Sequence, residues 1–214
     1  MKTVLEILVT LLILSNLLLM GSSRLGTLIR TVAAQALILG LMSILNHWHC
    51  LEWGLMLTAF VSILIKAMIL PRLLTRAVRE AHVRREVEPI VGFTASLLIG
   101  LLLLAVSVYL GSQLKQPQSG YASLLTPTSL FSMMVGLFIL VSRRKALTQV
   151  LGYLAMENGI YAFGLAFTVR ETFLVEIGIL LDVFVAVFVM GIMIYHINRN
   201  FDHIDTDKLA MLKE

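Results

Sequence analysis

Long apolar segments dominate the chain. Residues from Val4 to Met20 contain one charged residue, Glu6, and residues from Ile90 to Gly111 contain none. A helix needs roughly 20 apolar residues to cross a hydrocarbon core of about 30 Å. Lipid offers no hydrogen-bond partners, so a span must satisfy its own backbone groups, as a helix does. The period-two alternation typical of a membrane β-barrel is missing. The pattern therefore predicts an all-α integral membrane bundle.

We expect about seven transmembrane helices in one membrane domain covering residues 1–214. Pro71, Pro89 and Pro127 are interpreted as marking helix ends, where the missing N–H of proline costs least. The stretch from Arg72 to Glu88 mixes arginines with glutamates and is typical of a short surface helix. Helices 1–3 would occupy residues 1–70, a linking helix 4 residues 91–111, and helices 5–7 residues 127–214. The expected spans are 3–21, 27–46, 53–70, 91–111, 127–142, 147–168 and 173–196.

Composition supports a membrane protein and excludes several functions. Hydrophobic residues make up 58% of the chain and charged residues 14%, against about 25% charged in an average soluble domain. The single cysteine, Cys50, excludes an internal disulfide and a cysteine cluster for zinc or iron–sulfur binding. We find no nucleophile triad, phosphate loop or dinucleotide motif. No catalytic residue, cofactor site or metal site is therefore expected in this chain.

Basic residues are distributed unevenly over the expected loops. Three lie on one side of the expected membrane, at Lys2, Lys115 and Arg170. Because basic loops stay in the cytoplasm, the basic-rich side is predicted to be cytoplasmic, with the N-terminus outside and the C-terminus inside. The net charge of +4 is interpreted as a signal of topology, and no nucleic-acid binding is expected. Thirteen basic residues lie on the basic-rich side: Arg24, Arg30, Arg72, Arg76, Arg79, Arg84, Arg85, Arg143, Arg144, Lys145, Arg199, Lys208 and Lys213.

Four polar side chains lie deep within the apolar spans: Gln35, Lys66, Glu157 and Asp182. A charge at the bilayer centre costs about 2.5–3.5 kcal/mol on insertion scales, so such groups are rare unless they are paired, hydrated or functional. For Gln35 a structural hydrogen bond is the favoured interpretation. For Lys66 a structural ion pair and a proton-relay role both remain open, because a buried lysine can lose its proton.

Glu157 and Asp182 are the strongest candidates for a proton or ion path. Burial disfavours the charged form of a carboxyl group, so a buried carboxyl is suited to take up and release protons. Asp182 has only apolar neighbours in the sequence, whereas Glu157 is followed by Asn158 and Gly159. Glu176 lies nearer the outer end of the last predicted helix. The candidate path therefore comprises Glu157, Asp182, Lys66, Glu176 and Gln35.

Glycines within the spans are expected to allow close contact between helices. Together with the buried ionisable groups, they indicate a chain that is stabilised by lateral neighbours in the membrane. These glycines are Gly92, Gly100, Gly136, Gly152, Gly159 and Gly164.

Two stretches of the C-terminal half carry a family resemblance. They run from Tyr153 to Gly159 and from Val175 to Asp182. They resemble the E component of hydrogenase-4-type membrane-bound nickel–iron hydrogenases, and the resemblance extends across the chain in length and helix layout. From about Arg143 onward the chain is also similar to the K subunit of respiratory complex I, and more distantly to the C subunit of multisubunit sodium/proton antiporters.

The resemblance implies a role and a set of partners. In the K subunit two membrane glutamates belong to a polar axis that couples redox chemistry to proton pumping, and by position Glu157 and Asp182 match them. The aspartate is one methylene shorter than the family's glutamate. The implied partners are antiporter-like membrane subunits, a quinone-site-type membrane subunit and peripheral nickel–iron hydrogenase subunits, in the inner (cytoplasmic) membrane. This chain would be a non-catalytic subunit of an oxidoreductase complex of the hydrogenase or formate hydrogenlyase type, binding no cofactor itself.

Two other functions remain open at this point. The chain could be a structural subunit that bridges its neighbours, with its buried acids serving only as helix–helix pairs. It could also belong to a multisubunit cation/proton antiporter without a redox partner. Neutral amide substitutions of Glu157 and Asp182 distinguish the structural role from the ion path.

Overall fold

The structure, a computed structural model, describes residues 2–46, 64–80, 91–114, 122–167, 178 and 180–191. Within these ranges the regular structure is helical, in seven helical segments, and no strand occurs. Five of the helices are long and apolar enough to cross a membrane: Thr3–Gly21, Leu25–Leu45, Phe93–Gln113, Ser123–Ser142 and Ala146–Phe167. The prediction of an all-α, multi-pass membrane bundle is thereby confirmed. The expected spans 53–70 and 173–196 lie partly outside the described residues.

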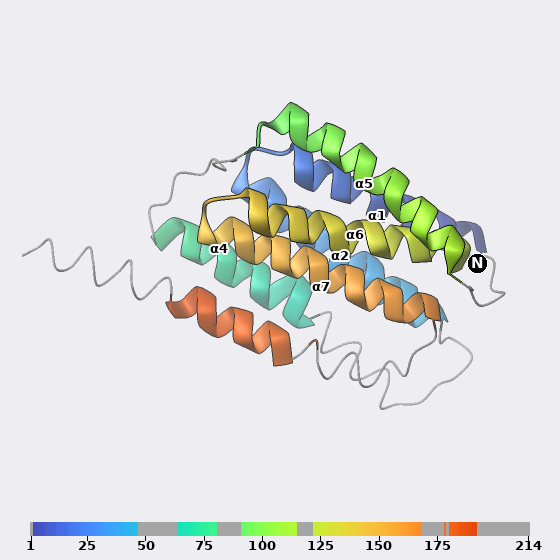
Figure 1. Ribbon diagram of the computed structural model, residues 1–214. Coiled ribbons are helices and arrows are strands. Elements are labelled where there is room, and N and C mark those ends of the chain that lie inside the picture. The colour runs from blue at the N-terminus through green and yellow to red at the C-terminus, as the bar shows by residue number, and fades with distance from the viewer. Residues whose placement is uncertain are drawn as a thin grey trace, which may run out of the picture.

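The helices lie roughly side by side in one bundle (Figure 1). Two of them, α6 (Ala122–Ser142) and α7 (Ala146–Phe167), pack closely together, and α1 (Lys2–Gly21) and α2 (Leu25–Asn46) pack against this pair. At one edge α5 (Phe93–Gln113) contacts α1 and α6. At the other edge α4 (Leu70–Glu80), preceded by the π-helix η1 (Ile65–Ile69), contacts α2, and the 180–191 helix lies beside it.

The bundle has an apolar core and an apolar exterior, as a protein surrounded by lipid requires. Phe131, Val135 and Leu151 are buried at the centre, whereas Leu102 of α5 and Phe184 of the 180–191 helix are largely exposed. The edge helix α5 shows how size decides which face turns inward. Its buried residues are all small: Ser96, Gly100, Ser107 and Gly111. Small residues let neighbouring helices approach closely and gain van der Waals contact, the main attraction between helices in lipid.

Glycines allow the same close approach between α6 and α7. A Cβ atom added to Gly136 would collide with the backbone nitrogen of Met156, and one added to Gly159 would lie 2.6 Å from the backbone nitrogen of Met133. In the same way Gly100 accommodates the sulfur of Met20. The expectation for these glycines is confirmed, whereas no atom of the described residues lies within 4 Å of a Cβ added to Gly92.

Pro71 does not end a helix, contrary to the sequence-based prediction. The chain is helical from Ile65 through Pro71 to Glu80. Proline normally breaks a helix because it lacks an N–H and because its ring collides with the carbonyl four residues earlier. Here the preceding turn is a π-helix, in which the N–H of Leu70 bonds to the carbonyl of Ile65, five residues back. The wider turn changes the local backbone geometry just ahead of the proline ring. The first part of the predicted surface helix, Arg72–Glu80, therefore continues η1.

Pro127 was also placed wrongly at a helix start. Helix α6 begins five residues earlier, at Ala122, and Pro127 lies inside it. Pro127 is the sixth residue of α6, beyond the four whose N–H groups have no partner within the helix, so α6 gives up the one backbone hydrogen bond that this position would donate. The ring packs against α5 at Gly111, where an added Cβ would lie 3.0 Å from Cβ of Pro127.

Arg143 lies in the turn between α6 and α7 and is buried, with 2% of its surface exposed. It donates a hydrogen bond from Nη2 to the carbonyl of Met20 in the last turn of α1, at 3.2 Å. Its guanidinium also lies 5.2 Å from the ring centre of Phe93, the first residue of α5. Burial lowers the pKa of the Arg143 guanidinium, yet the group stays charged because its ordinary pKa is so high. One side chain thus joins three segments of the bundle.

Replacing Arg143 with alanine is expected to destabilise the chain by about 2 kcal/mol or more. The substitution removes a hydrogen bond from a charged donor, worth about 1.5–3 kcal/mol, and a cation–π contact worth up to about 2 kcal/mol. Relief of the cost of burying the charge offsets only part of this loss. The matched control is Arg144→Ala, because Arg144 is the next residue and is exposed. Equal melting temperatures of the two variants in detergent would show that the burial cost cancels the contacts.

Candidate functional site

An ion pair joins η1 to α7 inside the bundle. Nζ of Lys66 lies 2.7 Å from Oε1 of Glu157, to which it donates a hydrogen bond. The side chains are only 11% and 5% exposed, respectively. Removing charges from water in a low-dielectric interior is costly unless they are paired with good geometry. The pairing explains how a lysine and a glutamate can both lie among apolar helices.

The 180–191 helix brings Asp182 to this pair. Asp182 is fully buried, and it interacts electrostatically with both Lys66, which attracts it, and Glu157, which repels it. Gly178 is four residues earlier and faces the same two groups. A Cβ added there would lie 3.3 Å from Oε1 of Glu157 and 3.7 Å from Nζ of Lys66. We call Lys66, Glu157 and Asp182 the ionisable cluster.

The cluster holds one cation for two carboxyl groups. Within the described residues, no donor reaches Oε2 of Glu157 or either carboxyl oxygen of Asp182, although all three atoms are buried. The two carboxyls are near enough to interact electrostatically. Ionised carboxylates only accept hydrogen bonds, so a bond between them would require a proton on one of them. One proton shared by the two acids would satisfy that bond and balance the charge of Lys66. The arrangement is therefore suited to hold and transfer a proton.

A neighbouring residue of α7 fixes the position of Glu157. Asn158 donates a hydrogen bond to the carbonyl of Val32 in α2, at 3.4 Å. Because α7 is anchored to α2 beside Glu157, the carboxyl is held at a defined place facing η1.

A second polar group lies between α1, α2, α6 and α7. Gln35 donates from Nε2 to Oγ of Ser15 at 2.9 Å and to Oδ1 of Asn16 at 3.0 Å. Ser132 lies 3.3 Å from the same Asn16 oxygen and 3.2 Å from the carbonyl of Ala155, and it can donate to either. Ala155 precedes Glu157 by two residues, so this network reaches α7 near the ionisable cluster. Oε1 of Gln35 is buried without a partner in the part of the chain that the structure describes.

The sequence-predicted site residues fall into three groups. Lys66, Glu157 and Asp182 come together. Gln35 belongs instead to the separate hydrogen-bond network with Ser15 and Asn16. Glu176 lies outside the described residues. Sequence reasoning missed Asn16, although the criterion that selected Gln35, a polar residue within an apolar span, also applies to it.

The fold and the ionisable cluster define a multi-pass α-helical membrane protein with paired charges inside its bundle. Residues 124–214 match the family model of NADH-ubiquinone/plastoquinone oxidoreductase chain 4L. That region covers α6, α7 and the 180–191 helix, and it contains Glu157 and Asp182 but not Lys66.

Two curated relatives match most of the chain. Hydrogenase-4 component E of Escherichia coli is 28% identical over 183 residues, covering 85% of this chain and 84% of the relative. An uncharacterized protein of Mycobacterium tuberculosis is 29% identical over 204 residues, covering 95% of this chain and 93% of that protein. No solved structure matches the chain significantly. The resemblance to hydrogenase-4 component E, and of the C-terminal half to a small complex I subunit, is confirmed.

Proposed function

We propose that this chain is a membrane-arm subunit of a hydrogenase-type, complex I-like energy-coupling complex, and that its ionisable cluster forms part of a proton or ion path. It is a single membrane domain in the cytoplasmic membrane, with its C-terminus in the cytoplasm. Its partners are antiporter-like and quinone-site-type membrane subunits and peripheral nickel–iron subunits. Support comes from the two similarities, to hydrogenase-4 component E and to chain 4L.

The observation that carries the ion path is the buried pair of Lys66 and Glu157 beside the carboxyl of Asp182, which has no hydrogen-bond partner among the described residues. Lys66 attracts both carboxylates. A proton on Asp182 leaves Lys66 paired with Glu157, as the structure has it. Transfer of that proton to Glu157 moves the negative charge to Asp182 and draws Lys66 toward it. A proton passing through the cluster is thus coupled to a change of ion pair, and Lys66 offsets the cost of the buried charge in both states.

One observation also favours a purely structural role. The pair of Lys66 and Glu157 has the short, direct geometry of an ion pair that joins two elements 91 residues apart in the chain. In that case the cluster positions η1 against α7, and the chain bridges neighbouring subunits without carrying ions.

The variants Glu157→Gln and Asp182→Asn distinguish the two roles. An amide keeps the size and hydrogen bonding of the carboxyl but cannot titrate, so the ion path predicts normal assembly and an ion flux reduced about tenfold or more. Complexes are purified in mild detergent through a tag on this chain, and subunit content and ion flux are measured in the same membranes. The control is Glu6→Gln, a carboxyl-to-amide change near the start of α1, outside the cluster.

The combination of subunit content and ion flux decides between the two roles. Complete subunit content with low flux supports the ion path. Poor assembly, with normal flux in the complexes that survive, supports the structural role. Full flux in both single variants and in the double variant excludes the path, and a chain purified without hydrogenase or antiporter-like subunits excludes the complex.

A further inference from the structure

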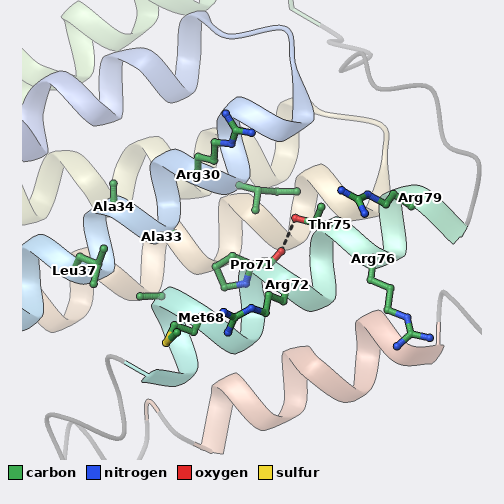
Figure 2. A pocket seen from close by; sticks show the side chains of 12 residues that line it. Arg30, Ala33, Ala34, Leu37, Met68, Pro71, Arg72, Thr75, Arg76 and Arg79 are labelled. Atoms are coloured by element: carbon green, nitrogen blue, oxygen red, sulfur yellow. Dashed lines mark hydrogen bonds between the residues drawn. The ribbon is translucent and has the colours of Figure 1, made fainter.

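A cavity of about 870 Å³ lies between α2 and the η1–α4 segment, apart from the ionisable cluster (Figure 2). Its size falls in the range typical of ligand sites, about 300–1,000 Å³. Figure 2 shows basic side chains toward one end and small or apolar side chains toward the other. The lining residues are Ile29, Arg30, Ala33, Ala34, Leu37, Ala67, Met68, Pro71, Arg72, Thr75, Arg76 and Arg79.

The basic end carries four arginines, and no acid occurs among the described lining residues. Arg72, Arg76 and Arg79 follow one face of α4, and Arg30 comes from the second turn of α2. The opposite face of α4, with Leu70, Leu74 and Ala77, is buried in the core, so the arginines are turned outward. Within the described part of the chain, the side chains of Arg30, Arg72 and Arg79 form no ion pair or hydrogen bond. The cavity therefore presents positive charge to an anionic group.

The other end is an apolar trough. Ala33, Ala34 and Ala67 leave space between the helices because their side chains are short, and Leu37 and Met68 form exposed apolar walls. Arg30 and Leu37 are seven residues apart on α2, which places them about 10 Å apart along the helix axis. This trough lies within the span Leu25–Leu45, at a depth where lipid chains surround the helix.

We propose that this cavity binds an anionic phospholipid, with its phosphate among the arginines and an acyl chain in the alanine trough. Free phosphate would use only the basic end and leave the trough empty. A zwitterionic lipid carries its own cation, which Arg30, Arg72 and Arg79 repel. Basic pockets between transmembrane helices are a known means of holding acidic headgroups. Under the orientation inferred from the basic residues, this lipid belongs to the cytoplasmic leaflet.

Binding of phosphatidylglycerol to the purified full-length chain in detergent tests the proposal. The test variant is Arg72→Gln with Arg79→Gln, and Arg76 is left intact because it has a further interaction within the chain. The control is Arg24→Gln with Arg144→Gln, which removes two exposed charges outside the cavity. We expect the test pair to weaken binding about thirty-fold, since each arginine contributes about a fivefold factor. The control pair should weaken binding less than threefold.

A third variant, Ala34→Trp, fills the trough and keeps every charge. It should weaken binding of phosphatidylglycerol at least as much as the arginine pair does. Because Ala34 is exposed, the variant is expected to melt at the same temperature as the unmodified chain without lipid. Phosphatidylcholine with the same acyl chains and soluble glycerol phosphate should each bind at least tenfold more weakly than phosphatidylglycerol. Equal binding of phosphatidylcholine, equal binding of glycerol phosphate, or equal losses in the two arginine pairs would each overturn the proposal.

Discussion

Methionine in place of Lys66 is expected to lower the yield and melting temperature of the chain more than loss of any exposed basic residue. Methionine is similar in length to lysine but is uncharged, so the substitution removes the only described cation of the ionisable cluster. Glu157 and Asp182 then remain buried without a counter-charge. Removing one partner of a buried pair typically costs about 3–5 kcal/mol. Protonation of both acids would recover part of that cost.

The double variant Lys66→Met with Glu157→Gln should recover most of the stability. It leaves no unpaired charge at Glu157, and replacing both partners of a buried pair by neutral groups is often close to neutral. Melting of the chain in mild detergent, with Arg144→Met as the control for loss of a cation, measures both effects. If Lys66→Met melts like Arg144→Met, the pair contributes nothing to stability.

The same double variant separates stability from transport. A complex that contains it and assembles normally, but moves no ions, shows that the charges serve the path and not only the packing. A complex that assembles and transports normally shows that an uncharged contact at this place is enough.

The five long helices were predictable because each is an apolar run of roughly the length that crosses a membrane. Helix ends were less predictable. Pro71 and Pro127 were interpreted as boundaries, yet one follows a π-helix and the other fits against Gly111 of a neighbouring helix. Both exceptions depend on tertiary contacts or local winding, which a proline by itself does not reveal.

The chemistry of the site was visible in the sequence, but its geometry was not. Lys66, Glu157 and Asp182 were each selected because a charge within an apolar span is costly. That criterion selects residues but does not say which of them contact one another. Lys66 and Glu157 lie on elements far apart in the chain, so their pairing could not be predicted from it. The structural role of Arg143, by contrast, was not visible in the sequence. As one of several basic residues outside the spans it counted only toward topology, and the contacts that bury it come from α1 and α5.

The packing of α6 on α7 also depends on tertiary contacts, and Gly152 is the most informative place to test it. A Cβ atom added there would lie 2.7 Å from the backbone nitrogen of Leu140 and 2.8 Å from the carbonyl oxygen of Gly136. These neighbours are backbone atoms, so no side-chain rotation can relieve the collision, and the helices must separate. Overpacking usually costs about 1–3 kcal/mol, and we expect Gly152→Leu to exceed that range because α7 carries Glu157 and buries much of the core.

Gly26→Leu is the matched control for this variant. Gly26 is also helical, but it is exposed, and no atom of the described residues lies within 4 Å of an added Cβ. Leucine favours the helix over glycine by up to about 1 kcal/mol, so this control should fold at least as well as the unmodified chain. Gly152→Leu should instead give little monodisperse protein in size-exclusion chromatography and lose the ion pair of Lys66 with Glu157. A Gly152→Leu chain that melts like Gly26→Leu would mean that α6 and α7 do not approach at their glycines, and the position assigned to Glu157 would then be wrong as well.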